Sequence, residues 1–213
     1  MKVHGFDISN YYNIVKQVAL ETDFAFEPVY VTPNTKEEFL PISPMGKIPA
    51  AETEFGPLAE TRAILTFIRE TLGDSALFPS SPWDMARADE LMSICDLYIE
   101  SQARRHLAEA IFNGERDERA HQEVPGAVAR GMAALGRRAK LSPYMLGDNY
   151  SVVDIYAFWT LFLARQIMQT MHDTDILASV DGLTQWYELV ASKDSTAKVA
   201  DSQAAAMKAM MGG

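Results

Sequence analysis

The hydrophobic pattern of this 213-residue chain changes once, across the segment between residues 74 and 83. Strand and helix signals alternate before the change, and every apolar pattern after it has helical spacing. The segment contains two prolines and several serines, which is typical of a connection between domains. A chain of this length can bury one or two cores. We therefore predict an α/β domain over residues 1–76 and an all-helical domain over residues 84–213.

The α/β part starts with a strand, a helix and a second strand. Residues 3–6 predict the first strand, residues 11–21 have apolar side chains at helical spacing, and residues 24–31 predict the second strand. A unit of this length favours parallel pairing of its strands. Pro28 cannot donate to a neighbouring strand, so the second strand is expected at an edge of the sheet.

A hairpin and an amphipathic helix complete the α/β part. Residues 48–53 and 57–59 predict two antiparallel strands with a turn between them. Residues 61–72 follow as a helix that Gly73 ends.

The helical part contains one segment that is apolar on every face. Residues 155–164 have this composition, and Ser151 and Asp154 have the spacing of a capping box directly before them. We predict that this helix lies in the centre of the domain. Further helices are predicted over residues 86–112, from Pro125 in a first turn to about residue 140, over residues 183–191 and in the Ala/Met-rich tail.

Charge and cysteine content restrict the possible partners. The chain carries 19 basic and 29 acidic side chains, a net charge of −10, and offers no positive surface for nucleic acid. Its longest apolar stretch is too short to span a membrane. The single cysteine, Cys95, excludes an internal disulfide and favours a reducing compartment, so the cytoplasm is the expected location.

No metal site is expected from the sequence. The four histidines, His4, His106, His121 and His172, have none of the short spacings that place two ligands on one helix face. Cys95 lies on an apolar helical stripe and is interpreted as a core residue.

Three separated segments carry a family resemblance. Residues 44–50 (PMGKIPA) resemble the P-x-G-K-[VI]-P segment of the glutathione transferases, and residues 60–64 (ETRAI) resemble their E-S-R-A-I helix start. Residues 151–154 (SVVD) are similar to the [ST]-x-x-D capping box of their C-terminal domain. The chain is thus identified as a member of the bacterial-type cytosolic glutathione transferases. This resemblance implies a thioredoxin-like α/β domain followed by an all-α helical bundle, and a homodimer.

The resemblance also implies a glutathione site. The Ile48–Pro49 bond is a candidate cis peptide, and the backbone of Ile48 would pair with the cysteinyl part of glutathione. Glu60 would hold the γ-glutamyl ammonium, and Thr61 at a helix N-terminus would hold the carboxylate, unless both residues only cap the helix. Lys47 would lie near a carboxylate of the ligand or hold the loop.

A donor to the glutathione sulfur is expected in the loop after the first strand. Ser9 is the first candidate, because its offset matches the serine of theta-like members of the family, and Asn10 and Tyr11 are alternatives. Ser9 is also a candidate helix N-cap. The arginine that usually follows the serine in the family is missing, and Asn13 and Ile14 stand in its neighbourhood.

The implied activity is transfer of the glutathione thiolate to a small, mostly apolar electrophile, without a metal. Tyr98 and Arg105 are candidates for the electrophile site, although a position in the helical core and a solvated face are the simpler interpretations. Two other classes remain open. One is a non-catalytic protein-binding module with this architecture, and the other is a glutathione-dependent isomerase, peroxidase or thiol-exchange enzyme.

Overall fold

The computed structural model describes residues 1–211, which form two compact units. The first unit contains residues 1–77 together with the C-terminal segment from Ser192 onward, and the second contains residues 78–191. The predicted boundary near residue 76 agrees with this division. The prediction that the helical domain continues from residue 84 to the C-terminus is wrong, because helix α9 (Asp194–Met211) belongs to the first unit.

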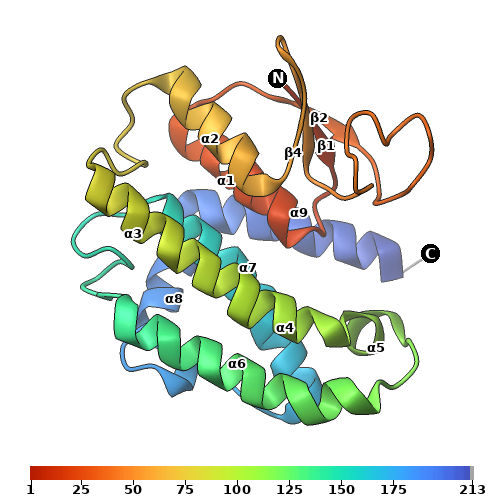
Figure 1. Cartoon of the computed structure of the whole chain (residues 1–213), viewed down its shortest axis with the longest axis vertical. Helices are drawn as coiled ribbons and strands as arrows, with labels where there is room; N and C mark the ends of the chain where they lie inside the picture. The colour runs from red at the N-terminus through yellow and green to blue at the C-terminus, as the bar shows by residue number, and fades with distance from the viewer. Residues whose placement is uncertain (212–213) are drawn as a thin grey trace. The chain divides into compact units, whose positions relative to one another are not determined.

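The first unit is built on a four-stranded mixed sheet (Figure 1). Its strands are β1 (Lys2–Gly5), β2 (Glu27–Tyr30), β3 (Ala50–Thr53) and β4 (Gly56–Ala59), in the spatial order β2-β1-β3-β4. Strands β1 and β2 pair in parallel, as predicted, and β3 pairs antiparallel with both β1 and β4. Strand β2 is shorter than the predicted 24–31, but it carries Pro28 at an edge of the sheet, as expected.

Three helices accompany this sheet in the first unit. Helix α1 (Asn10–Thr22) and helix α2 (Thr61–Leu72) contact each other, and the predicted bounds of α2 are confirmed. Helix α9 contacts α1, where the buried Gln17 amide donates to the Thr196 hydroxyl over 2.7 Å. Contacts of this kind with α1 place this helix in the first unit, although the segment was predicted as part of the helical domain.

The second unit begins with a helical segment that changes its hydrogen-bonding pattern. Helix α3 (Pro82–Ser93) continues into a π-helical stretch (Ile94–Glu100), then α4 (Ser101–Ala103), a 3₁₀ turn (Arg104–His106) and α5 (Leu107–Phe112). The prediction of one uniform helix over residues 86–112 is therefore wrong, because this stretch is divided into segments with different hydrogen-bonding patterns. A π-helical turn contains one more residue than an α-helical turn and so rotates the side chains that follow it. A search for apolar residues at the α-helical spacing of 3.6 cannot predict this change.

Helix α6 (Glu118–Arg138) starts earlier than predicted. Its N-cap is Asp117, whose carboxylate accepts from the Ala120 amide over 2.9 Å. Pro125 therefore lies inside the helix and not in its first turn. Because proline has no N–H, it cannot donate to the carbonyl of His121 one turn earlier. The acidic N-cap residue Asp117 is the sequence signal for the start of this helix, and the prediction based on Pro125 did not use it.

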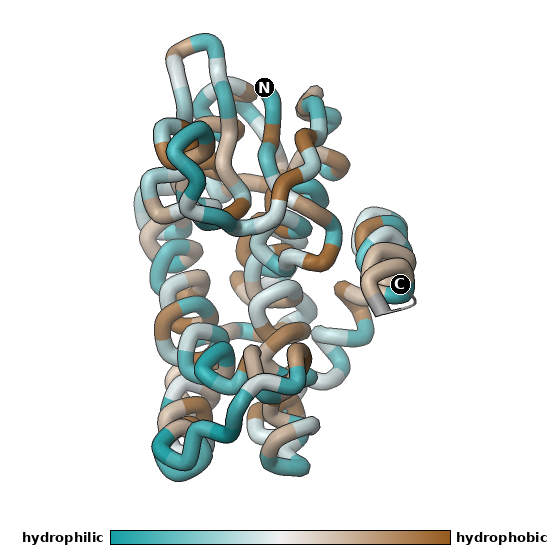
Figure 2. Tube along the Cα trace, turned by 90° about the vertical axis from the view of Figure 1, so that its right-hand side faces the viewer, coloured by the Kyte–Doolittle hydropathy of each residue, from teal (hydrophilic) through white to brown (hydrophobic). Residues whose placement is uncertain are grey.

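The last two helices of the second unit form as predicted. Helix α7 (Val152–His172) opens on the capping box of Ser151 and Asp154, and most of its side chains are buried. Helix α8 (Leu183–Ala191) has the predicted bounds. Figure 2 shows hydrophilic and hydrophobic residues interspersed along the helical segments, as expected when a helix buries one side. Within residues 1–211, no helix is both long enough and apolar enough to cross a membrane.

Candidate functional site

The register of the sheet brings three distant segments to one end of the first unit. His4 of β1 pairs with Ala50 of β3, and Ala50 pairs with Ala59 of β4. The loop after β1, the Ile48–Pro49 pair before β3 and the Glu60–Thr61 pair after β4 therefore leave the sheet at the same end. Strand pairing brings the segments that carry the predicted glutathione residues to this end, although the loop of Ser9 lies about 40 to 50 residues before the other two segments in the sequence.

The Ile48–Pro49 peptide bond is cis, as predicted. The loop before it is held by two hydrogen bonds, from the Asn34 amide to the Gly46 carbonyl over 3.0 Å and from the Ser43 hydroxyl to the Lys47 carbonyl over 2.7 Å. Gly46 has φ +62°, and a Cβ at this position would lie 2.2 Å from the Asn34 carbonyl oxygen, so a side chain cannot be accommodated. The Lys47 side chain is exposed.

Glu60 has an unusual backbone for a residue with a side chain. Its φ of 72° lies in the region that favours glycine, a conformation that costs roughly 1–3 kcal/mol and occurs mostly at functional sites. The Glu60 side chain is exposed, and among the described residues it makes no capping hydrogen bond to α2. The interpretation of the Glu60 side chain as a helix cap is therefore wrong. Thr61 is the first residue of α2 and is 7% exposed.

Ser9 is the N-cap of α1. Its hydroxyl oxygen accepts from the Tyr12 amide over 3.3 Å, so the capping interpretation is confirmed. Accepting this bond uses one lone pair, and the O–H proton can still be donated to a ligand. The first turn of α1 contains no acidic residue among those described, so no carboxylate there offsets the positive end of the helix dipole.

The loop before Ser9 is fixed from α1. The side-chain amide of Asn13 donates to the backbone carbonyl of Asp7 over 2.9 Å, and the Lys16 ammonium forms a 2.6 Å ion pair with the Asp7 carboxylate. Asn13, which stands where the family arginine is missing, thus acts on the loop backbone. This role could not be predicted, because it depends on a turn that the sequence does not specify.

The alternative donors differ in burial. Asn10 is 3% exposed, and Tyr11 is half-buried. The neighbouring Tyr12 is buried, and burial, together with the Asp7 carboxylate, raises the pKa of its hydroxyl to about 12. Ser9, Asn10 and Tyr11 remain the candidate donors, and Tyr12 belongs to the core.

Helix α9 contributes a residue that sequence reasoning missed. The Gln203 amide donates to the carbonyl of Ile8 over 3.3 Å, directly before Ser9. Gln203 itself is 8% exposed, whereas Met210 on the same helix is 46% exposed. The tail is therefore helical throughout its described part and supports the loop that holds Ser9. The glutamine directly before the alanine run of the tail was the sequence signal for a polar contact on this helix.

Tyr98 and Arg105 lie in the second unit. The Tyr98 side chain is 56% exposed on the π-helical stretch, so its interpretation as a buried core residue is wrong. Arg105 lies on the 3₁₀ turn and forms a 2.9 Å ion pair with Glu123. The assignment of these two residues to an electrophile site stays a prediction.

Cys95 is expected to be unreactive in the folded protein. It is completely buried, and burial raises the pKa of its thiol to about 12, although a hydrogen bond with Thr160 opposes this shift. At pH 7 on the order of one thiol in 10⁵ would then be ionised. An aromatic disulfide reagent should react at least about 100-fold more slowly with the native chain than with the chain in denaturant. Rapid reaction of the native chain would contradict this assignment.

Comparison with known proteins identifies the family of this chain. A sequence model described as the glutathione S-transferase N-terminal domain matches residues 3–76, and one described as the C-terminal domain matches residues 118–189. A glutathione S-transferase of Pseudomonas putida is 32% identical over 211 residues, which cover 99% of this chain and 96% of the relative. The chain belongs to the glutathione S-transferase family.

Two further similar proteins share less of their sequence with this glutathione S-transferase family member. Glutathione transferase F2 of Populus trichocarpa has the same fold, with a TM-score of 0.81, 19% identity and coverage of 96% of this chain and 99% of that chain. A probable elongation factor 1-gamma of Arabidopsis thaliana is 26% identical over 148 residues, which cover 70% of this chain and 36% of that protein. The chain is thus similar, in fold or in part of its sequence, to proteins whose names indicate different roles.

Proposed function

We propose that this protein binds glutathione at the end of the sheet in its first unit and transfers the glutathione thiolate to small, mostly apolar electrophiles. The observation that carries the proposal is the register of β1, β3 and β4, which gathers Ser9, Ile48 and the Glu60–Thr61 pair. Membership of the glutathione S-transferase family supports it.

Each end of glutathione meets a complementary group in this proposal. The exposed Glu60 carboxylate pairs with the γ-glutamyl ammonium, and Thr61 and the N-terminus of α2 bind the adjacent carboxylate. The cysteinyl backbone pairs with Ile48, which lies two residues before β3 and so extends the sheet by a short ligand strand. The exposed Lys47 ammonium attracts a ligand carboxylate in a chain whose net charge is −10.

The reactive sulfur comes from the ligand, because the protein's single cysteine is buried. A free thiol has a pKa near 8.5, so a group that stabilises the thiolate raises the concentration of the nucleophile at neutral pH. The Ser9 hydroxyl donates to the sulfur, and the N-terminus of α1 adds a favourable field. The thiolate then attacks the electrophilic carbon, forms the C–S bond and releases a leaving group, or adds to an activated double bond.

Substitution of Thr61 tests the binding part of the proposal. We expect Thr61→Val to weaken glutathione binding roughly 3- to 10-fold, because the variant loses one hydrogen bond while the α2 amides remain. Calorimetric titration with glutathione measures the affinity. The matched control is Thr66→Val on the exposed face of the same helix, where the hydroxyl donates to the Arg62 carbonyl over 3.0 Å. Equal affinity in both variants would exclude Thr61 as a ligand contact.

A non-catalytic binding module is the second candidate. Its support is the similarity to elongation factor 1-gamma proteins and the capping role of Ser9. Unmodified protein that neither binds immobilised glutathione nor gains thermal stability with millimolar glutathione would favour this candidate. Binding without any conjugation of a chlorodinitrobenzene-type substrate would also favour it and would leave the glutathione site intact.

Three broader properties belong to the same proposal. A two-fold homodimer in the cytoplasm and a role in detoxification accord with the family and with a single buried cysteine. An isomerase or peroxidase reaction would use the same thiolate. Thiol exchange through a cysteine of the protein is disfavoured by the burial of Cys95.

A further inference from the structure

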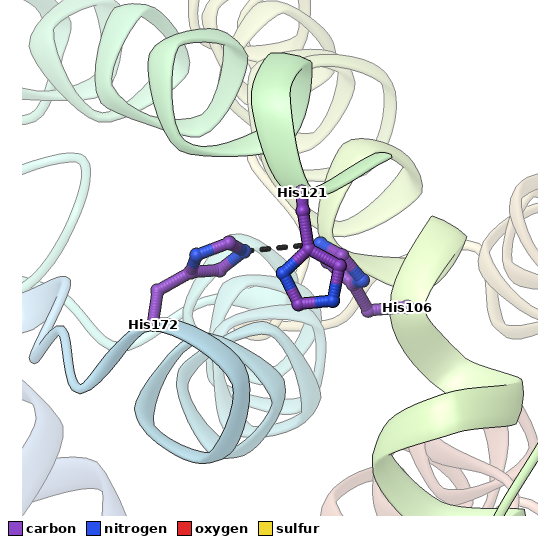
Figure 3. Close-up of side chains that lie close together, drawn as sticks. All are labelled: His106, His121 and His172. Carbon is purple, nitrogen blue, oxygen red and sulfur yellow. Dashed lines mark hydrogen bonds between the residues drawn. The ribbon is translucent and has the colours of Figure 1, made fainter. Parts of the chain in front are cut away.

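Three of the four histidines meet in the second unit. His106 ends the 3₁₀ turn before α5, His121 lies in the first turns of α6, and His172 is the last residue of α7. They are 15 and 51 residues apart in the sequence. Figure 3 shows the three rings pointing toward one another from these three elements. The expectation of no metal site rested on the lack of short spacings between the histidines, and it did not anticipate this meeting of three separate helical elements.

The turn between α5 and α6 produces this meeting. Asn113 adopts a left-handed backbone with φ 52°, and the Gly114 amide donates to the Ala108 carbonyl over 2.9 Å. A Cβ at Gly114 would lie 3.0 Å from atoms of Ala108, so a larger residue would push the turn away. The close reversal returns the chain so that His121 lies beside His106, with ring centroids 4.5 Å apart.

The separation of the rings suits one metal ion. The other two centroid distances are 4.9 Å between His106 and His172 and 5.3 Å between His121 and His172. One ring nitrogen from each histidine lies within 4.8 Å of the others. A tetrahedral ion with metal–nitrogen distances of about 2.0–2.1 Å separates its ligand nitrogens by about 3.3 Å. The ring nitrogens would therefore have to approach one another by at most about 1.5 Å to reach that separation.

One nitrogen of the buried His106 ring makes no hydrogen bond within the described part of the chain. The ring is completely buried, its Nε2 lies 3.0 Å from Nε2 of His172, and within residues 1–211 its Nδ1 makes no hydrogen bond. The Nδ1 faces the Glu109 carboxylate at 3.7 Å, which is too long for a hydrogen bond. A buried polar nitrogen without a partner costs about 1–3 kcal/mol, so the cluster is incomplete as a hydrogen-bonded network.

Glu109 holds one ring of the cluster and lies near a second. Its carboxylate is 3.0 Å from Nε2 of His121, within hydrogen-bond distance, and 3.7 Å from Nδ1 of His106. Metal-bound histidines commonly donate their second N–H to a carboxylate, as His121 can to Glu109. With Nε2 of His121 held by Glu109, the Nδ1 of His121 is the nitrogen available to a metal ion, together with Nε2 of His106 and Nε2 of His172, which lie 3.0 Å apart.

We propose that His106, His121 and His172 bind one divalent transition-metal cation of the zinc class, with Glu109 orienting the His121 ring. Imidazole nitrogens are typical ligands for Zn²⁺, Co²⁺, Ni²⁺ and Cu²⁺. The side chains of His121 and Glu109 are 12% and 18% exposed, which provides access for the ion and for a water molecule in a fourth position. The site lies within the second unit and does not depend on the glutathione proposal.

The charges around the cluster are compatible with a bound cation. The carboxylate of Glu109 lies 3.7 Å from the His106 ring and 3.0 Å from the His121 ring, and it contributes negative charge beside the cluster. The nearby Arg116 guanidinium is paired with Glu118 over 2.6 Å.

Metal titration of the tag-free, chelator-treated protein tests the site. We expect Co²⁺ to bind with a stoichiometry of one per chain and to give the visible absorption of a four- or five-coordinate ion, and Zn²⁺ to displace it. His121→Gln and His172→Gln should each weaken Zn²⁺ binding by about 100-fold or more, and Glu109→Gln by roughly 10-fold. These positions are partly exposed, so the variants are expected to fold, and circular dichroism verifies this.

The remaining histidine provides the matched control. His4 lies in the first unit, where its Nε2 is 2.8 Å from the Glu52 carboxylate, and His4→Gln should leave metal binding unchanged. Two results would overturn the proposal. One is the absence of stoichiometric Co²⁺ or Zn²⁺ binding to the unsubstituted protein, and the other is binding that survives in both folded cluster variants.

Discussion

Replacement of Asp154 by alanine is expected to lower the free energy of unfolding by about 3–5 kcal/mol. The completely buried carboxylate accepts hydrogen bonds from the Met145 amide, the Trp186 indole, and the Ser151 amide and hydroxyl, over 2.8 to 3.1 Å. The variant leaves several buried donors without an acceptor. Thermal unfolding followed by circular dichroism should show a midpoint about 10 °C lower.

The chain contains an exposed copy of the same motif. At the start of α3, the Asp84 amide donates to the Ser81 hydroxyl oxygen over 3.0 Å, and the Ser81 hydroxyl bonds the Asp84 carboxylate over 2.6 Å. Because Asp84 is exposed, Asp84→Ala should cost at most about 1 kcal/mol. Similar losses of unfolding free energy in the two variants would mean that burial of the Asp154 hydrogen bonds contributes little to stability, which would contradict this prediction.

Asp154→Asn distinguishes hydrogen bonding from packing at this position. The amide has nearly the shape of the carboxylate, but one oxygen becomes an NH₂ donor that faces other donors. We therefore expect Asn to destabilise the helical unit nearly as much as Ala. Burial raises the pKa of Asp154 and the hydrogen bonds oppose this shift, so the four donors are what keep a charged side chain tolerable in this core.

The elements that could be predicted from the sequence are those whose ends and pairing depend on residues close together in the chain. Helix α2 has the predicted bounds, because its apolar spacing, Thr61 and Gly73 agree. The hairpin of β3 and β4 and the parallel pairing of β1 with β2 follow from short connections and strand periodicity. The position of the candidate glutathione site follows from the same features, since it is formed where these strands end.

The features that the sequence did not predict depend on contacts between distant residues. The membership of α9 in the first unit depends on Gln17 meeting Thr196, about 180 residues later. The histidine cluster depends on a left-handed turn at Asn113 and on the end of α7 at His172. No short spacing encodes either arrangement, because neither depends on neighbours along one helix or strand.

Replacement of Ser9 by alanine is expected to lower kcat/KM for a chlorodinitrobenzene-type substrate about 10- to 100-fold, which corresponds to about 1.4–2.7 kcal/mol. The variant removes the hydroxyl proposed to donate to the glutathione thiolate. The ultraviolet absorbance of bound thiolate should titrate at a higher pH than in the unsubstituted protein, because its stabilising donor is lost. Asn10→Ala and Tyr11→Phe should change both measurements less.

The difficulty with this variant is that Ser9 also caps α1, so part of any loss could come from a disturbed helix. Ser81 provides the comparison, because its hydroxyl oxygen caps α3 by accepting from the Asp84 amide. If Ser9 only caps its helix, Ser9→Ala and Ser81→Ala should each cost about 1 kcal/mol of stability and leave the thiolate titration unchanged. If Ser9 also contacts sulfur, only Ser9→Ala shifts that titration, since helix stability has no direct effect on the ionisation of a bound ligand. An unshifted thiolate titration in Ser9→Ala would transfer the donor role to Asn10 or Tyr11.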